Sequence, residues 1–197
     1  MVYLMSNNFI KEIVSGGQTG VDRAALDIAL EFKIKHGGWC PYGRKAEDGI
    51  IPAKYQLKEA SEPTSGESVD LDAIYKKRTE LNANDSDGTL IIISDLPKGG
   101  TLYTIEMAEK YKRPYLVYNL SENSNIEEVA DWIIKSNIHK LNVAGPRASQ
   151  AVGIYNAAYD GLSRLLNCRL LINDNRHPAV VIASEAKQSS SKAKLST

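Results

Sequence analysis

Short apolar runs alternate along the chain with segments whose apolar residues recur at helical spacing. The apolar runs predict five strands, at 10–14, 34–39, 89–94, 115–118 and 141–144. The amphipathic segments predict five helices, over 20–33, 69–81, 102–111, 126–136 and 150–166. Strands that alternate with helices are typical of a parallel sheet covered by helices on both faces. We therefore predict an α/β fold with one doubly wound parallel sheet of about five strands.

The run Thr89–Ser94 predicts the centre of this sheet. Its apolar residues are continuous, as in parallel strands that are buried on both faces. In such sheets, right-handed crossovers bring the loops after the strands to one edge, where ligands bind. The loops expected at this edge begin near Gly16, Cys40, Ser94, Asn119 and Gly145.

Two glycine-rich loops share one design. Residues 15–20 (SGGQTG) and 98–101 (KGGT) each lie between an apolar run and a predicted helix. The free N–H groups and the dipole of a helix N-terminus favour an anion, so these loops are candidate phosphate sites. Thr19 is expected to cap the first helix, with Asp22 at the capping-box position. The alternative is a turn that only packs the helix tightly on the sheet, because neither the dinucleotide fingerprint nor the P-loop pattern is met.

The loop after the second predicted strand contains several reactive or charged side chains. Arg44 and Lys45 could contact an anion, and Cys40 offers a thiol. Two carboxylates, Glu47 and Asp48, follow closely. The alternative is a solvated loop whose charges pair with one another. The loop alone does not decide between these interpretations.

Composition narrows the class of protein. The 197 residues fit one domain, predicted over 1–172, and the polar segment 173–197 is expected to be disordered. Lys plus Arg and Asp plus Glu both number 24, so charge gives no argument for nucleic acid or an anionic membrane. Two cysteines suggest a reducing compartment, and no apolar stretch approaches the ~20 residues of a membrane span. For these two reasons we expect a cytoplasmic protein. The three histidines are scattered and no metal motif is present, so we expect no metal site.

Several motifs, in their order along the chain, resemble the bacterial putative molybdenum cofactor carrier family. They are SGGQTGVDRAALDIAL, GGWCPYGRKAEDGIIPAKYQL, YKKRTELNANDSDGTLIII, KGGT and LNVAGPR. The resemblance covers about residues 11–166. It implies a Rossmann-like fold related to the lysine-decarboxylase-like (LOG) and DprA superfamily. It also implies binding of molybdenum cofactor (molybdopterin), a pterin that carries a dithiolene and a phosphate.

The leading hypothesis is a carrier that holds a small phosphorylated ligand and needs no general base. The phosphate is expected on the loop 16–20, supported by the second glycine loop and Arg147. Arg23 and Arg44 would add charge-assisted hydrogen bonds, and Ser86 and Asp87 would contact the pterin or a ribose. The candidate binding residues are Gly16, Gly17, Gln18, Thr19, Gly20, Arg23, Arg44, Ser86, Asp87, Gly99, Gly100, Thr101, Thr104 and Arg147.

An enzyme is the rival hypothesis, because the superfamily also contains phosphoribohydrolases that cleave nucleoside monophosphates. Their signature is PGGxGTxxE, and residues 98–106 keep its paired glycines and place Glu106 at its acid position. Arg78 is the candidate for the arginine of those enzymes. Leu102 and Tyr103 depart from the signature, which favours binding over catalysis, and Glu106 is equally explained as an ordinary helix acid. A sensor of a nucleotide-derived ligand is the third hypothesis. Relatives in this superfamily commonly form dimers or tetramers, so the resemblance also implies a homo-oligomer.

Overall fold

The computed structural model describes residues 9–60, 71–122 and 125–168. Its centre is a five-stranded sheet with the order β2-β1-β9-β7-β8, in which every pairing is parallel. The strands are β1 (Glu12–Val14), β2 (Lys35–Gly37), β7 (Gly88–Ile93), β8 (Tyr115–Asn119) and β9 (Lys140–Ala144). The predicted α/β fold with a parallel sheet of about five strands is confirmed. The segment 173–197 lies outside the described residues.

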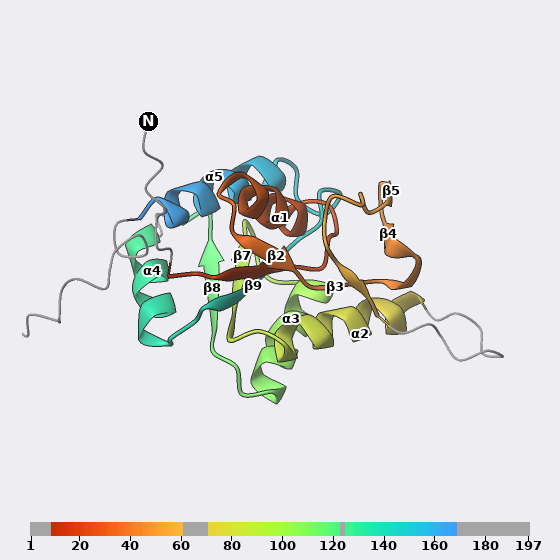
Figure 1. The fold of residues 1–197 in the computed structure, drawn as a ribbon, viewed down its shortest axis with the longest axis horizontal. Helices are drawn as coiled ribbons and strands as arrows, with labels where there is room; N and C mark the ends of the chain where they lie inside the picture. Colours follow the sequence, from red (N-terminus) through yellow and green to blue (C-terminus); the bar gives the residue numbers. More distant parts are fainter. Residues whose placement is uncertain (1–8, 61–70, 123–124, 169–197) are drawn as a thin grey trace, which may run out of the picture.

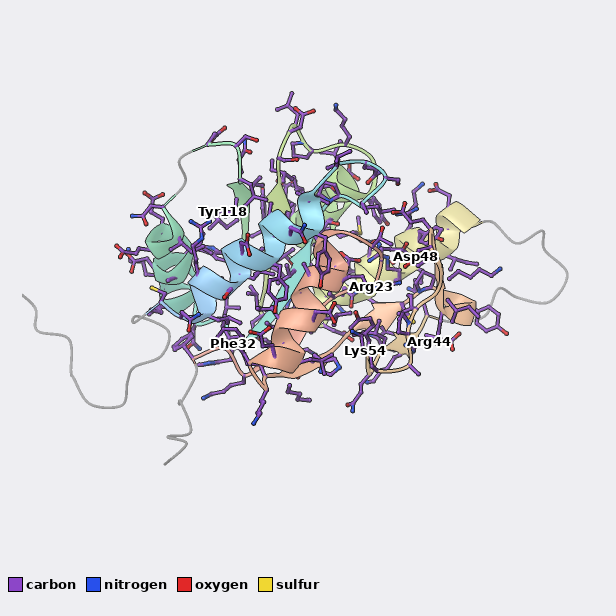
Figure 2. All side chains as sticks on the ribbon, turned by 90° about the horizontal axis from the view of Figure 1, so that it is seen from above. Arg23, Phe32, Arg44, Asp48, Lys54 and Tyr118 are labelled. Carbon is purple, nitrogen blue, oxygen red and sulfur yellow. The ribbon has the colours of Figure 1, made fainter. Side chains whose placement is uncertain are left out.

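Helices cover both faces of the sheet (Figure 1). One face carries α1 (Val21–Glu31), α4 (Ile126–Lys135) and α5 (Ile154–Leu166). The other carries α2 (Leu71–Asn84) and α3 (Gly100–Lys110). Figure 2, seen from above, shows α1 and α5 side by side over the sheet. None of the helices in the described ranges is long and apolar enough to cross a membrane.

The central strand β7 contributes buried side chains to both faces of the sheet. All six of its residues are buried, as its continuous apolar run predicts. Successive side chains of a strand point to opposite faces. Leu90 and Ile92 belong to the apolar cluster beneath α1, α4 and α5. Thr89 and Ile91 therefore face α2 and α3.

A segment of short elements, residues 38–60, leaves the main sheet after β2, and we call it the excursion. Gly38 starts it with a φ of 126°, and a Cβ there would lie 2.3 Å from the carbonyl oxygen of Ser15. The predicted strand 34–39 is therefore split, and Cys40 belongs to a second small sheet instead of the main edge. The elements of the excursion are β3 (Trp39–Cys40), the 3-10 turn η1 (Tyr42–Arg44), β4 (Lys45–Ala46), β5 (Gly49–Ile50) and β6 (Lys58–Glu59).

The helices α2 and α3 begin at Leu71 and Gly100, within two residues of the predicted starts, and the starts of α5 and α1 show larger or more informative differences. The helix α5 begins at Ile154 and not at residue 150, because Gly153 is left-handed with a φ of 76°. Val152, which precedes this turn, is fully exposed and does not pack against the core. The cap of α1 is Gly20 and not Thr19, whose hydroxyl instead donates to Glu47.

Candidate functional site

A cavity of about 620 Å³ lies between α2 and α3, at the carboxyl ends of β1 and β9. Its volume is in the range of about 300–1,000 Å³ that is usual for small-molecule sites. We call it the α2–α3 cavity. The sequence-predicted residues that line it are Gln18, Arg78, Gly99, Gly100, Thr101, Thr104, Glu106 and Arg147. The structure thus brings the second glycine loop, the candidate acid and two arginines to one place.

The N-terminus of α3 opens into this cavity. Its cap residue is Gly99, with a φ of 51°, and no side chain caps the helix. The first turn contains no acidic residue. A Cβ on Gly99 or Gly100 would meet nothing within 4 Å, so there is space beside the backbone N–H groups. The N–H of Thr101 already donates to the carbonyl oxygen of Lys98. The other N–H groups of the first turn and the helix dipole favour an anion at such a helix end.

The N-terminus of α1 is covered instead. The N–H of Val21 donates to the carbonyl oxygen of Pro146 over 3.3 Å. A Cβ on Gly20 would lie 2.4 Å from the same oxygen, so the segment after β9 packs directly on this turn. The N–H of Gln18 donates to the carboxylate of Asp22, which occupies the place of an external anion.

The other two glycines of this loop also allow close packing. A Cβ on Gly16 would lie 1.5 Å from Nη1 of Arg78, and one on Gly17 would lie 2.6 Å from the side chain of Leu57. Neither glycine lines the α2–α3 cavity. The structure therefore favours the packing interpretation of this loop, and an open anion position lies at the second glycine loop.

A buried ion pair forms one wall of the cavity. Arg78 Nη1 lies 2.9 Å from Asp22 Oδ2, and the two side chains are 14% and 4% exposed. Burial raises the pKa of Asp22, and the positive charge of Arg78 opposes that rise. Nε of Arg78 has no hydrogen-bond partner. The sequence placed Asp22 at the capping-box position of α1, and its pairing with Arg78, 56 residues further along the chain, was not predicted.

Arg147 lies at the same cavity from the loop after β9. Its guanidinium is 4.6 Å from the centroid of the Tyr75 ring on α2. A stacked guanidinium uses its face for the ring and can still donate hydrogen bonds from its edge. Its backbone N–H donates to Oε1 of Gln150 over 3.1 Å, which fixes the loop. Tyr75 and Gln150 line the cavity as well, and neither was predicted as a site residue.

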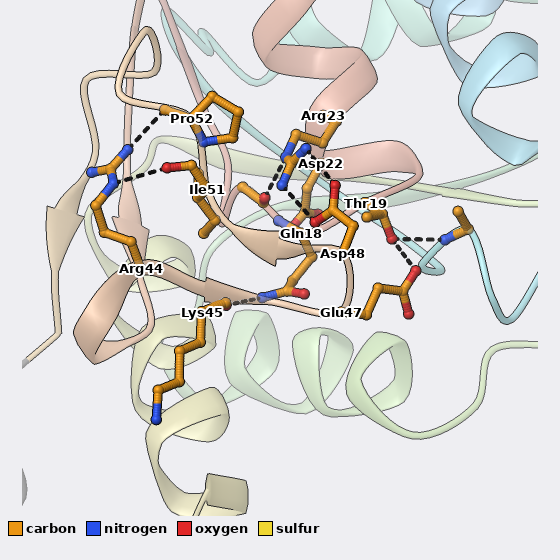
Figure 3. A network of polar contacts seen from close by, with 12 residues as sticks. Gln18, Thr19, Asp22, Arg23, Arg44, Lys45, Glu47, Asp48, Ile51 and Pro52 are labelled. Carbon is orange, nitrogen blue, oxygen red and sulfur yellow. Dashed lines mark hydrogen bonds and ion pairs between the residues drawn. The ribbon is translucent and has the colours of Figure 1, made fainter.

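The two other candidate arginines hold the excursion in place and do not line the cavity (Figure 3). Arg23 donates to the carbonyl oxygen of Gly17 and pairs with Asp48 at 3.0 Å. Arg44 donates to backbone carbonyl oxygens of the excursion, those of Ile51, Pro52, Tyr55 and Leu57. Their roles are therefore accounted for by the fold, and any contact with a ligand stays a prediction.

Glu47 fastens the excursion to the loop after β9. Its carboxylate accepts hydrogen bonds from the hydroxyls of Thr19 and Ser149. Burial raises the pKa of Glu47, but the bonds from Ser149 and Thr19 outweigh burial and lower it. The carboxylates of this loop thus pair with residues outside it: Glu47 with Thr19 and Ser149, and Asp48 with Arg23. The alternative interpretation had expected the charges of the loop to pair with one another.

Ser86 and Asp87 lie at the opposite edge of the sheet, before β7 begins. The carboxylate of Asp87 accepts from the backbone N–H groups of His139 and Lys140, at 3.0 and 2.7 Å. The Ser86 hydroxyl donates to the carbonyl oxygen of Ala83. The structure therefore does not bring this pair to the α2–α3 cavity. Within residues 9–60, 71–122 and 125–168, no group of three or more His, Cys, Asp or Glu could hold a metal ion.

Comparisons with known proteins find a matching family model and a similar crystal structure. A model of the circularly permutated YpsA SLOG family matches residues 13–166. A crystal structure named "putative molybdenum carrier protein", from Syntrophus aciditrophicus SB, is 47% identical with a TM-score of 0.70. The similarity covers 81% of this chain and 96% of that one. No curated protein matches the chain.

Proposed function

This chain belongs to the circularly permutated YpsA SLOG family, and we propose that it binds a phosphate-bearing small molecule in the α2–α3 cavity. The molybdenum cofactor is the first candidate, because a 47% identical protein is named a putative molybdenum carrier. The single observation that carries the proposal is the uncapped N-terminus of α3, which opens into the cavity beside Gly99 and Gly100. The phosphate would bind there and not on the covered turn before α1.

The surroundings of this helix end suit a phosphate. The hydroxyl of Thr104 already donates to the carbonyl oxygen of Gly100, which holds the first turn in shape. Thr101 is buried. Both Thr101 and Arg147 line the cavity. A guanidinium beside free backbone N–H groups is a usual combination for binding phosphate. When bound, the cofactor would supply the dithiolene that holds molybdenum; these residues of the chain would supply the phosphate contacts.

A charge at Gly100 tests the proposal. Gly100→Asp adds a carboxylate where the phosphate would lie, so we expect at least a tenfold loss of affinity by electrostatic repulsion, or about 1.4 kcal/mol. Asp in the first turn of a helix is itself stabilising by about 0.3–1 kcal/mol, so the variant should fold. The matched control is Gly100→Ala, whose Cβ meets open space and should leave affinity unchanged.

The ligand would be identified by native mass spectrometry of the purified protein, followed by denaturation and analysis of what is released. Isothermal titration with inorganic phosphate, pyrophosphate and the released compound then compares the variants. Equal affinity of wild type and Gly100→Asp for all of these would overturn the site assignment. A released pterin supports the carrier, and a released nucleotide supports a different phosphorylated ligand in the same site.

A glycosidase is the second candidate, because Glu106 and Arg78 line the same cavity. Water would add to the anomeric carbon, the C–N bond would break, and the base would leave with a proton. Glu106 would stabilise the developing positive charge. Incubation with nucleoside monophosphates and chromatography for free base tests this activity. Turnover that disappears in Glu106→Gln would support it, and absence of free base with the wild type would exclude these substrates.

A further inference from the structure

The side-chain amide of Gln18 is buried, and only one of its two polar atoms has a hydrogen-bond partner. The residue is 1% exposed and lines the α2–α3 cavity. Its Nε2 donates to the carbonyl oxygen of Lys45 over 2.8 Å. Its Oε1 has no hydrogen-bond partner (Figure 3). The orientation of the amide is fixed, because a flipped amide would place two oxygen acceptors against each other.

An unpaired buried oxygen is unusual in a folded protein. Most buried side-chain polar atoms have at least one partner, since burial removes their hydrogen bonds to water. Arg78 presents the opposite case in the same cavity, a buried Nε donor without a partner. Both residues contact one atom, because the N–H of Gln18 and Nη1 of Arg78 donate to Oδ2 of Asp22. Gln18 and Arg78 thus both contact Asp22 in the wall of the cavity.

We propose that Oε1 of Gln18 accepts a hydrogen bond from an N–H group on a nitrogen heterocycle of the bound ligand. This inference rests on the proposed function, because the phosphate of the same ligand would lie at the N-terminus of α3. The edge of an aminated or lactam-type ring offers a donor and an acceptor side by side. Its donor would pair with the free oxygen of Gln18.

The inference gives Gln18 a role in specificity. Backbone N–H groups at α3 contact a phosphate without distinguishing what is attached to it. A buried acceptor that is left unpaired disfavours ligands without a donor, and such polar sites discriminate strongly. The protein would therefore prefer phosphorylated heterocycles that carry N–H groups over those with bare rings.

A matched pair of nucleotides tests this preference. Guanosine 5′-monophosphate carries ring N–H and amino donors, and purine riboside 5′-monophosphate has the same phosphate and ribose but no donor on its ring. We expect the wild type to bind the guanosine compound about tenfold more tightly in isothermal titration. Gln18→Met keeps the length of the side chain and removes the acceptor, so it should reduce that preference to within about twofold.

Two controls separate a specific effect from a damaged cavity. Gln56→Met makes the same chemical change at an exposed side chain that does not line the cavity. It should keep the tenfold preference. The affinity for pyrophosphate, which has no heterocycle, should be the same in wild type and Gln18→Met.

The outcomes distinguish this inference from the proposed function. If both nucleotides bind equally to the wild type and Gln18→Met changes nothing, a water molecule or the ribose satisfies Oε1. The inference then fails and the phosphate site stands. If neither nucleotide nor pyrophosphate binds, the proposed phosphate site fails and the inference fails with it.

Discussion

The two faces of the sheet are built by different physical means. Beneath α1, α4 and α5 lies one continuous apolar cluster that includes Ile28, Ile133 and Leu162, each 1% exposed or less. Beneath α2 and α3 the apolar residues Ala83, Met107 and Ala108 are joined by buried polar residues. They include Thr79, Asn82, Thr89, Thr101, Thr104 and Asn142.

Single strands serve both of these faces. In β9, Leu141 and Val143 join the apolar cluster, while the intervening Asn142 donates to the hydroxyl of Thr89 on the other side. Alternation along a strand makes this separation possible. The apolar face can stabilise the fold by excluding water, and the polar face can leave a cavity with unpaired donors and acceptors. Stability and the candidate site are thus assigned to opposite sides of one sheet.

The largest effect should come from breaking the buried ion pair on the polar face. Arg78→Met leaves the buried carboxylate of Asp22 without its charged partner, which should cost about 3–5 kcal/mol of unfolding free energy at pH 7. Burial already raises the pKa of Asp22, so the variant should recover stability at acidic pH by protonating it. Chemical denaturation at pH 5 and 7 measures both effects.

The control for this variant is Lys35→Met, which breaks an exposed pair with Glu12 and should cost less than about 1 kcal/mol. The double variant Asp22→Asn with Arg78→Met should regain part of the loss, because no charge is left buried. A double variant as unstable as Arg78→Met alone would show that shape, and not charge pairing, governs the polar face.

Truncation in the apolar cluster should have the next largest effect. Leu162→Ala leaves a cavity among buried side chains and should cost about 3 kcal/mol in chemical denaturation. Unlike the variant of Arg78, it should show no dependence on pH between 5 and 7. Leu102→Ala, at a residue that is 46% exposed, should change stability by no more than about 0.5 kcal/mol. A strong effect of Leu162→Ala on ligand affinity would contradict the separation of the two faces.

The smallest effect concerns the contact between α2 and α3. Glu80 accepts hydrogen bonds from Tyr111 and Lys110, and these lower its pKa to about 2 from 4.5. The ionised form is therefore favoured in the folded protein. Its contribution should be complete above pH 4.5 and disappear as the pH falls towards 2.

Glu80→Gln should accordingly cost about 1 kcal/mol at pH 7 and progressively less below pH 4.5. Denaturation curves of both proteins across this range would show the difference closing. A constant difference at all pH values would mean that the charge of Glu80 does not hold the two helices together.

The periodicity of the sequence determined the fold, because burial of apolar side chains depends on spacing that is visible along the chain. The run at β7 predicted a central strand, and the alternation of strands and helices predicted both covered faces. A helix after the glycines that follow β7 was likewise predicted, and α3 begins at the second of them, Gly100.

Only the tertiary structure decided which glycine loop is open. The two loops have similar sequences, but Pro146 and Arg78 approach the loop before α1 from segments that are distant in sequence. The role of Arg44 was also decided by the tertiary structure, because its guanidinium donates to backbone carbonyl groups of the excursion. The unpaired oxygen of Gln18 was equally invisible, because a hydrogen bond depends on distance and direction in space. A sequence shows which groups are available, and the packing of remote segments determines which of them remain free for a ligand.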